Sequence, residues 1–306
     1  MVKPFFSIII PTYNQSSFLE KALISVFAQN YKNYEIIVVD NNSNDDTSRV
    51  IKKYKKKIIY KKIKNNGIIA KSRNLGIKIA QGQWLAFLDS DDYWEKTKLY
   101  NIHKFIKKYF FDVICHSEWL LKRKIQYCSY GPFEKNFYEK LLRYGNRFSM
   151  SATVVKKNFL IKKKILFDQK KIFISSEDYS FFMHLAREQA NFFFTLKPLG
   201  YHLFHQKSIS SKLTKHIKSS YMVKKYHVLK LQNFTKNKKK LLKDAKAYLD
   251  LKIILFNSKK SGRYNQIKKI YNFFLEKPKY TILYLQNLIY KKLKDNLLYV
   301  FFKSSL

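Results

Sequence analysis

One short segment combines a buried strand with a dense group of carboxylates. Residues 84–88 are all apolar, and three aspartates, Asp89, Asp91 and Asp92, follow within four positions. An unbroken apolar run of this length is typical of a strand that is covered on both faces. In open α/β sheets, ligands bind at the edge where the strands end. The segment therefore predicts a doubly covered sheet with a functional edge.

Carboxylates packed this tightly repel one another unless a cation lies between them. Hard oxygen ligands favour Mg²⁺ or Mn²⁺ over softer metals. A divalent cation at such an edge most often holds a phosphate, so the segment predicts a site for a nucleotide diphosphate. The alternative is an Asp-rich turn that caps the helix that follows, and these residues alone do not decide between the two.

The first hundred residues alternate between strand and helix patterns, which predicts a parallel sheet with helices on its faces. We expect strands at 5–10, 34–39, 58–60 and 84–88, and helices from Ser16 or Ser17 to Phe27, at 47–55 and at 70–80. A further helix, strand and helix are expected up to about residue 125. Weaker signals beyond that point predict strands at 151–155 and 191–195 and a helix at 176–189.

The C-terminal third is helical in pattern and strongly basic. Residues 207–306 hold 25 basic and 4 acidic residues, in a chain whose net charge is +40. Such helices suit an anionic bilayer, because lysine heads reach the phosphates while aromatic rings lie at the interface. The alternative is that the same rings pack onto the rest of the chain. The rings concerned are those of Tyr271, Phe273, Phe274, Tyr280, Tyr284, Tyr290, Tyr299, Phe301 and Phe302.

Composition narrows the class of protein. The two cysteines, Cys115 and Cys128, lack paired spacing, which argues against disulfides and structural zinc and favours the cytoplasm. No apolar run is long enough to span a membrane, and the run at 5–10 is too short for a secretory signal. The high positive charge is typical of proteins that bind nucleic acid. However, no nucleic-acid motif is present, and an A/T-rich genome would also enrich lysine.

Two more residues fall at the predicted edge of the sheet. Asp40 ends the second strand, where a carboxylate accepts hydrogen bonds from a base or ribose. Arg73, on the third helix, offers a planar fork of donors. Taken singly, Asp40 is a turn former and Arg73 a surface residue, but their placement together with Asp89 and Asp91 favours a nucleotide site. A dinucleotide oxidoreductase is excluded, because the turn at 11–14 has none of the required glycines.

Four motifs together resemble the nucleotide-sugar half of family 2 glycosyltransferases. They agree with that family in order and spacing over about residues 5–100. The motifs are Phe6-Ser7-Ile8-Ile9-Ile10-Pro11-Thr12-Tyr13-Asn14, Glu35-Ile36-Ile37-Val38-Val39-Asp40-Asn41-Asn42-Ser43 with Asp45-Asp46-Thr47, Asn66-Gly67 with Ala70, Arg73-Asn74 and Gly76, and Asp89-Ser90-Asp91-Asp92.

The resemblance implies an α/β fold of the GT-A type, a Rossmann-like, mostly parallel sheet flanked by helices, here with a C-terminal helical extension. It implies a catalytic domain at 1–210, with a nucleotide-sugar half at about 1–110 and an acceptor half at about 111–210. The basic, aromatic region at 211–306 follows.

The resemblance also implies roles for residues on the donor side. Tyr13 and Asp40 contact the uracil or other base, Arg73 contacts the nucleotide, Asp89 lies on the ribose side, and Asp91 binds a Mn²⁺ or Mg²⁺ ion that bridges the diphosphate. The residues implied to bind the donor are Pro11, Thr12, Tyr13, Asp40, Arg73, Asp89 and Ser90. Those implied to hold the metal are Asp91, Asp89 and His205.

On the acceptor side, residues 176–186 resemble the family's Glu-Asp segment at a helix start, in which the second carboxylate is the general base. In this chain that residue is Asp178, and a carboxylate suits a single displacement because it takes the proton of the attacking hydroxyl. The alternative is an acidic first helical turn after Ser175 or Ser176, which favours the helix dipole.

A last pattern of the family places a tyrosine, a histidine and two serines after the acceptor region, here Tyr201, His205, Ser208 and Ser210. An imidazole at His205 binds Mn²⁺ or phosphate oxygens, or serves as a structural hydrogen-bonding group. The family's arginine after the tyrosine is His202 here, so a role for that position does not carry over.

The Gln-x-x-Arg-Trp motif of the family's processive synthases is absent. The resemblance therefore implies a metal-dependent, non-processive, inverting enzyme that moves one sugar from a nucleotide-diphosphate donor, a UDP-sugar, to a hydroxyl of a surface glycan such as lipopolysaccharide, capsule or a lipid-linked oligosaccharide. It would be cytoplasmic or peripheral on the inner face of the membrane. The alternatives are a nucleic-acid-binding protein and a non-catalytic homologue that uses its basic surface.

Overall fold

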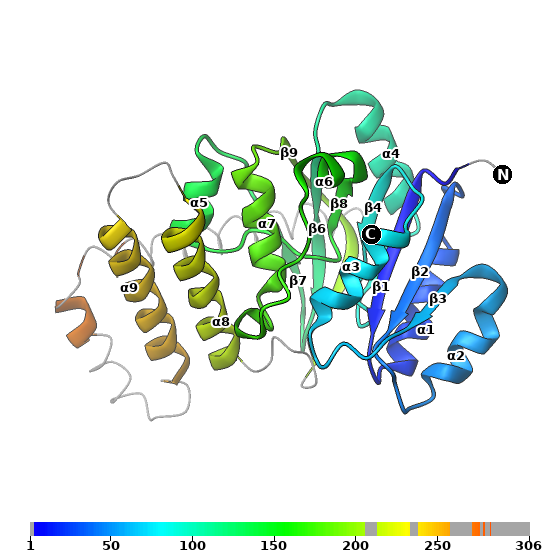
Figure 1. Ribbon diagram of the computed structural model, residues 1–306, viewed down its shortest axis with the longest axis horizontal. Helices are drawn as coiled ribbons and strands as arrows, with labels where there is room; N and C mark the ends of the chain where they lie inside the picture. The colour runs from blue at the N-terminus through cyan, green and yellow to red at the C-terminus, as the bar shows by residue number, and fades with distance from the viewer. Residues whose placement is uncertain are drawn as a thin grey trace.

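A single curved sheet of nine strands forms the centre of the molecule, and helices cover both of its faces (Figure 1). The structure is a computed structural model that describes residues 3–205, 213–232, 238–257, 271–275, 278 and 282. The strand order is β3-β2-β1-β4-β8-β6-β9-β5, and β7 pairs with β6. The expected α/β fold of the GT-A type is confirmed.

The first half of the sheet is parallel, as the alternating pattern predicts. Its strands are β1 (Phe6–Thr12), β2 (Tyr34–Asp40), β3 (Ile59–Lys62) and β4 (Trp84–Phe87), and they are joined by α1 (Ser16–Phe27), α2 (Thr47–Tyr54) with a 3₁₀ turn at Lys55–Lys57, and α3 (Ile69–Ile79). All four strands end at the same edge, so the polar residues that follow them come together there.

The second half of the sheet mixes both directions. Here β8 (Thr153–Lys156) lies antiparallel between β4 and β6 (Val113–Leu121), β9 (Phe192–Leu203) runs parallel to β6, and β5 (Tyr93–Trp94) pairs antiparallel with β9. The helices of this half are α4 (Lys98–Lys108), α5 (Phe137–Tyr144), α6 (Lys157–Lys163) and α7 (Glu177–Arg187), with a 3₁₀ turn at Lys171–Phe173.

One sequence expectation in this half is wrong, and one expected strand is longer than expected. The helix expected just before residue 125 does not form; β6 continues to Leu121 and turns into β7 (Ile125–Cys128), because the short charged segment at 122–124 makes a hairpin turn. The strand expected at 191–195 continues to Leu203, since irregularities in its register against β6 at Ser117 let the pairing resume beyond Pro198. That extension carries His202 to the functional edge.

The apolar runs of the strands supply two separate cores, because successive side chains of a strand point to opposite faces. Ile9, Ile37 and Phe87 pack with α3, α5 and α7 on one face. Ile8, Ile36 and other alternate residues pack with α1, α2 and α4 on the other. The unbroken apolar runs of β1, β2 and β4 thus reflect burial on both faces.

The C-terminal helices pack against the acceptor half, at the end of the molecule opposite β3 (Figure 1). They are α8 (Leu213–Tyr226), a π-helical turn at His227–Leu231 and α9 (Lys238–Asn257). Val223, Val228 and Leu241 belong to the same core as residues of α3, α5 and α7. In the parts of the chain that the structure describes, no helix is long and apolar enough to cross a membrane.

The division of the chain at residue 210 stays a prediction. Of the aromatic residues expected to face a bilayer, Tyr271 and Phe274 are exposed and Phe273 is buried. The remaining rings of that set lie outside the described residues, as do Ser208 and Ser210.

Candidate active site

The ends of β1 and β2 bring the first donor-side residues together. Pro11 and Thr12 are buried, Tyr13 is 55% exposed, and Thr12 pairs with Asp40 in the register of the two strands. An exposed ring beside a buried carboxylate is the arrangement that the resemblance implies for a base-binding pocket. These roles stay predictions.

Asp40 already has three hydrogen-bond donors. Its Oδ1 accepts bonds from the backbone N–H of Ser43 at 2.9 Å and from the Ser43 hydroxyl at 2.6 Å, and its Oδ2 accepts one from Tyr60 at 2.8 Å. Burial and the Asp40 charge raise the pKa of Tyr60. Asp40 therefore serves as the turn former that its position suggests, and any contact with a base is additional.

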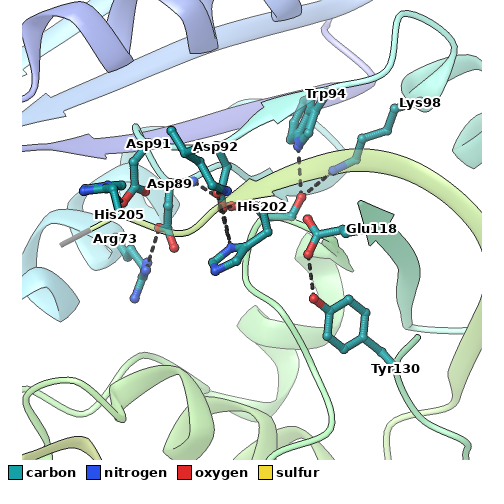
Figure 2. A network of polar contacts seen from close by, with 12 residues as sticks. Arg73, Asp89, Asp91, Asp92, Trp94, Lys98, Glu118, Tyr130, His202 and His205 are labelled. Carbon is teal, nitrogen blue, oxygen red and sulfur yellow. Dashed lines mark hydrogen bonds and ion pairs between the residues drawn. The ribbon is translucent and has the colours of Figure 1, made fainter. Parts of the chain in front are cut away.

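Arg73 joins the end of β4 to the start of α7, and Figure 2 shows its contact with Asp89. It is 3% exposed; its Nη2 lies 2.7 Å from Oδ1 of Asp89, and its Nη1 lies 2.8 Å from Oε1 of Glu177. Its guanidinium also lies over the ring of Phe167, 5.4 Å from the centroid. Arg73 is therefore a buried bridge, and the interpretation of it as a surface helix residue is wrong.

The bridge is strongly electrostatic. Burial alone would lower the pKa of Arg73, but the charges of Asp89 and Glu177 raise it, so the guanidinium stays charged. Burial raises the pKa of Glu177, and Arg73 opposes that shift. Two atoms of this pair, Nε of Arg73 and Oε2 of Glu177, are buried and have no hydrogen-bond partner.

Asp91 lies beside His205 at the edge of the sheet. The His205 Nε2 is 3.0 Å from Oδ2 of Asp91, and its ring stacks on Phe18 of α1 with centroids 4.7 Å apart. Burial and the charges of Asp92 and Asp89 raise the pKa of Asp91 to about 6, while His205 opposes that shift. Three carboxylates thus crowd one turn, which is the condition under which a cation binds.

The expected metal fits part of this donor set. The carboxylate of Asp91 and the imidazole of His205 are ligand types that suit Mn²⁺, and a bound diphosphate would add oxygens. Asp89 has one oxygen engaged by Arg73, which leaves its Oδ2 for a metal or a ribose. Ser90 donates its hydroxyl hydrogen bond to Gln15, so its side chain supports the turn.

Asp92, for which the sequence predicts no separate role, holds the turn after β4 against the end of β9. It is 2% exposed and accepts hydrogen bonds from the backbone N–H of Leu203 at 3.0 Å and from the Ser151 hydroxyl. The Nδ1 of His202 lies 3.2 Å from its Oδ1. The nearby carboxylates outweigh burial and raise the pKa of His202 to about 10. The His202 imidazole is therefore paired with Asp92 at the position where the family pattern has an arginine.

Behind this turn lies a buried polar network (Figure 2). The Ser151 carbonyl accepts hydrogen bonds from Lys98 Nζ at 2.7 Å and Trp94 Nε1 at 2.9 Å, and the carboxylate of Glu118 accepts one from Tyr130 at 2.7 Å. Burial lowers the pKa of Lys98 and raises that of Glu118. These residues lie far apart in the chain and form no motif, so no signal in one sequence points to them.

Asp178 lies at the start of α7, close enough to Asp89 and Arg73 for their charges to act on its carboxylate. Its side chain is half-buried, and Asn146 Nδ2 approaches its Oδ2 at 3.3 Å. Burial and the charge of Asp89 raise the pKa of Asp178, and Arg73 opposes that shift. A carboxylate with a raised pKa close to the donor edge is suited to general-base chemistry.

The first turn of α7 is acidic, as the alternative expects, and carries Glu177 and Asp178, but it lacks a side-chain cap. Ser176 occupies the N-cap position without a side-chain cap, and its hydroxyl contacts Ser220 of α8 instead, at 2.9 Å. Ser175 has φ +78°, a conformation that costs an L-residue on the order of 1 kcal/mol or more. The backbone between the 3₁₀ turn at Lys171–Phe173 and α7 is therefore strained just before the two carboxylates.

Among the described residues, one group of three metal-ligand types converges within 4.8 Å: Asp168, His184 and His227. It lies behind the candidate site, along α7. Asp168 accepts hydrogen bonds from Lys170 at 2.8 Å and from Ser180 at 2.6 Å, and His184 Nε2 lies 2.9 Å away. The ring nitrogens of His227 lie 3.0 Å from the hydroxyl of Tyr138 and 3.1 Å from that of Ser180, so each of the three groups has a protein partner and the cluster is a structural network.

The chain matches the sequence profile of Glycosyl transferase family 2 over residues 7–167, more than half of its length. It belongs to that family. The family consists of transferases, so the expectation of an enzyme that transfers a sugar is confirmed.

Several relatives of the family have assigned activities. WfaP of Escherichia coli, a UDP-Glc:alpha-D-GlcNAc-diphosphoundecaprenol beta-1,3-glucosyltransferase, is 36% identical over 185 residues, 58% of this chain and 69% of WfaP. TarP of Staphylococcus aureus, a poly(ribitol-phosphate) beta-N-acetylglucosaminyltransferase, is 31% identical over 194 residues, 61% of this chain and 58% of TarP. For S. aureus TarS the matched part is only 20% of the relative.

Solved structures agree on the fold. S. aureus TarS 1–349 in complex with UDP-GlcNAc superposes with a TM-score of 0.59 at 22% identity, covering 78% of this chain and 70% of that one. The mannosyltransferase PcManGT from Pyrobaculum calidifontis, in complex with GDP-Man and Mn²⁺, superposes with a TM-score of 0.59 at 17% identity, covering 96% and 88%. At these identities the likeness shows the fold alone.

Proposed function

We propose that this family 2 enzyme is a metal-dependent, non-processive, inverting glycosyltransferase that moves one sugar from a UDP-sugar to a hydroxyl of a lipid-linked surface glycan. The observation that carries the proposal is the bridge of Arg73, which joins Asp89 on the donor side to Glu177 beside Asp178. The buried guanidinium of Arg73 thus links Asp89 to Glu177, which is the neighbour of the proposed base Asp178.

The donor would lie along the strand ends. Tyr13 would stack on the base, and Asp40 with the buried Pro11 and Thr12 would close the nucleoside pocket. Asp89 and Ser90 would lie along the ribose and diphosphate, with Arg73 holding Asp89 in place. This assignment follows the strand ends of β1, β2 and β4, which meet at one edge.

Asp91 and His205, with Asp89, would hold a Mn²⁺ or Mg²⁺ ion. When bound, the ion supplies positive charge that stabilises the departing diphosphate. The protein's own contribution is to keep Asp91 and His205 in place. Phe18 does so by stacking on the His205 ring, and Asp92 does so by binding the end of β9.

Asp178 would remove the proton of the acceptor hydroxyl as that oxygen attacks the sugar carbon. The bond between that carbon and the diphosphate breaks in the same step, so the configuration inverts. The raised pKa of Asp178 brings the carboxylate closer to the operating pH, where a base is most effective.

For the acceptor we propose a sugar on a lipid diphosphate at the inner face of a membrane. The support is the relative WfaP, whose named acceptor is a diphosphoundecaprenol-linked sugar, together with the basic α9 helix. Lysines 238, 239, 240, 243 and 246 of α9 are exposed, as binding to anionic headgroups requires.

A panel of nucleotide sugars tests the proposal. Purified full-length protein is incubated with each donor, with Mn²⁺ or Mg²⁺, and with a short-chain polyprenyl-diphosphate-N-acetylglucosamine acceptor, and both nucleotide release and the product are measured. We expect one UDP-sugar to give a product that carries a single added residue, and chelation to stop the reaction. Transfer that survives chelation, or repeated addition, would contradict the proposal.

A further inference from the structure

The segment that carries the two carboxylates of α7 is held from outside by the C-terminal helix α8. His216 and Ser220 are four residues apart and therefore lie on one face of α8. The Nδ1–H of His216 donates a hydrogen bond to the carbonyl oxygen of Ser175 at 2.5 Å, and the Ser220 hydroxyl lies 2.9 Å from that of Ser176. Ser219 adds a hydrogen bond to the carbonyl of Ile172 at 3.2 Å.

The residue that His216 holds has an unfavourable backbone conformation. Ser175 has φ +78°, where an L-side chain is disfavoured and glycine is not. A chain free to relax would return Ser175 to negative φ, which would turn its carbonyl away from His216 and re-aim the residues that follow. Glu177 and Asp178 are the second and third of those residues. The contact with His216 therefore opposes the relaxation that would move them.

We propose that His216, with Ser220, is a positioning residue for transfer: it holds Ser175 at positive φ and so fixes the direction in which Asp178 faces the donor site. This inference rests on the proposed role of Asp178 as the base. It also gives the described part of the C-terminal region a task besides membrane contact, because α8 then completes the catalytic geometry of the preceding domain.

A positioning role has a distinct kinetic signature. The hydrogen bonds given above place His216 on the α7 side of the site, while the donor residues lie on the strand ends. His216→Ala is therefore expected to lower kcat by about ten- to a hundredfold, the range that a misplaced catalytic group produces, and to leave KM for the nucleotide sugar unchanged. His216→Asn keeps an N–H donor near the position of Nδ1 and is expected to retain most of kcat.

A substitution that changes the backbone preference of residue 175 gives the most specific test. Glycine adopts positive φ without a steric penalty, so Ser175→Gly removes the strain that His216 is inferred to oppose. In the double variant Ser175→Gly with His216→Ala, we expect most of the lost kcat to return. Ser175→Gly alone should behave like the wild type. Lys218→Ala, an exposed residue of the same helix, is the matched control.

Full-length variants are assayed as release of UDP from UDP-glucose or UDP-N-acetylglucosamine with Mn²⁺, and by hydrogen–deuterium exchange of the peptide around 172–180. Loss of kcat in His216→Ala, faster exchange in that peptide and recovery by Ser175→Gly would support the inference. An unchanged kcat would overturn it. A loss that Ser175→Gly does not recover, accompanied by an equal loss of donor affinity, would show a general packing role and overturn it too.

The same measurements separate this inference from the proposed function. If Asp178→Asn turns over donor like the wild type, the assignment of the base fails. The exchange experiment still reports whether His216 holds the entry to α7, because its readout does not depend on activity.

Discussion

The Nη1 of Arg73 and the Oε1 of Glu177 lie 2.8 Å apart although 104 positions separate the two residues in the chain. The same guanidinium binds Asp89 through Nη2. The sheet edge at Asp89 and the start of α7 therefore share the buried guanidinium of Arg73. A substitution on either side changes the electrostatic environment of the other. Glu177 points inward to this bridge, whereas its neighbour Asp178 stays half-buried and accessible.

Removal of one partner of this bridge is expected to be costly. Arg73→Ala leaves Glu177 buried and unpaired, and breaking such a pair destabilises a protein by about 3–5 kcal/mol. The double variant with Glu177→Ala should lose less than the sum of the single variants, because it removes the stranded charge. Free energies of unfolding from urea titrations measure both. Additive losses would show that the two side chains are not coupled in solution.

Asp91→Asn is expected to abolish the response to metal. Mn²⁺ that binds the folded protein raises its melting temperature, and loss of a ligand removes that rise. In the absence of metal, the Asp91→Asn variant should be slightly more stable than the wild type, since the repulsion by Asp89 and Asp92 is gone. Differential scanning fluorimetry with and without Mn²⁺ tests this, with Asp250→Asn on α9 as the control. An undiminished metal-induced shift would rule out Asp91 as a ligand.

The buried ring of His227 is expected to weaken the protein in acid. Burial, reinforced by the charges of His184 and Arg187, lowers the pKa of His227 to about 3. Below about pH 6.5 the unfolded chain binds a proton at this ring and the folded chain does not, so the free energy of unfolding falls as the pH drops toward 3. His227→Gln should show a shallower decrease across that window in urea titrations. If the free energy of unfolding of the two proteins depends on pH with the same slope, the His227 ring is not buried in its neutral form.

A side chain at position 82 is expected to destabilise the folded protein. A Cβ there would lie 2.6 Å from the backbone nitrogen of Ser7 and 2.7 Å from the carbonyl carbon of Phe6, atoms of β1 that have no freedom to move. Gly82→Ala should cost about 1–3 kcal/mol. Gly67→Ala is the comparison, because Gly67 has φ +74° but open space around it, and its cost should be about 1 kcal/mol. Equal losses in thermal unfolding would contradict this packing.

The fold was predictable in its first half because local pattern and long-range packing agree there. The run at 84–88 is buried on both faces, and its unbroken apolar composition predicts this burial. The hairpin of β6 and β7 was missed because its partner strand is short and half-exposed, so its periodicity is weak. The full length of β9 was missed for a different reason: Lys197 and Pro198 interrupt an apolar pattern that resumes after the register shift.

The site was predictable where its residues follow strand ends. Asp40, Asp89 and Asp91 fall at one edge because three strands are parallel, which alternation alone implies. The roles of Asp92 and Glu118 depend on contacts across the sheet, and those of His216 and Ser220 on a helix that docks from 40 residues away in sequence. Such contacts are set by tertiary packing and leave no spacing pattern in a single chain.

The most direct measurement is the turnover of Asp178→Asn compared with its affinity for the UDP-sugar donor. The substitution keeps the shape of the side chain and removes its ability to take a proton. We expect transfer to fall by about 10²- to 10⁴-fold while the dissociation constant for the donor, measured by calorimetry with Mn²⁺, stays the same. Transfer at the wild-type rate, or a donor affinity lost together with activity, would contradict the assignment of Asp178 as the base beside a separate donor pocket.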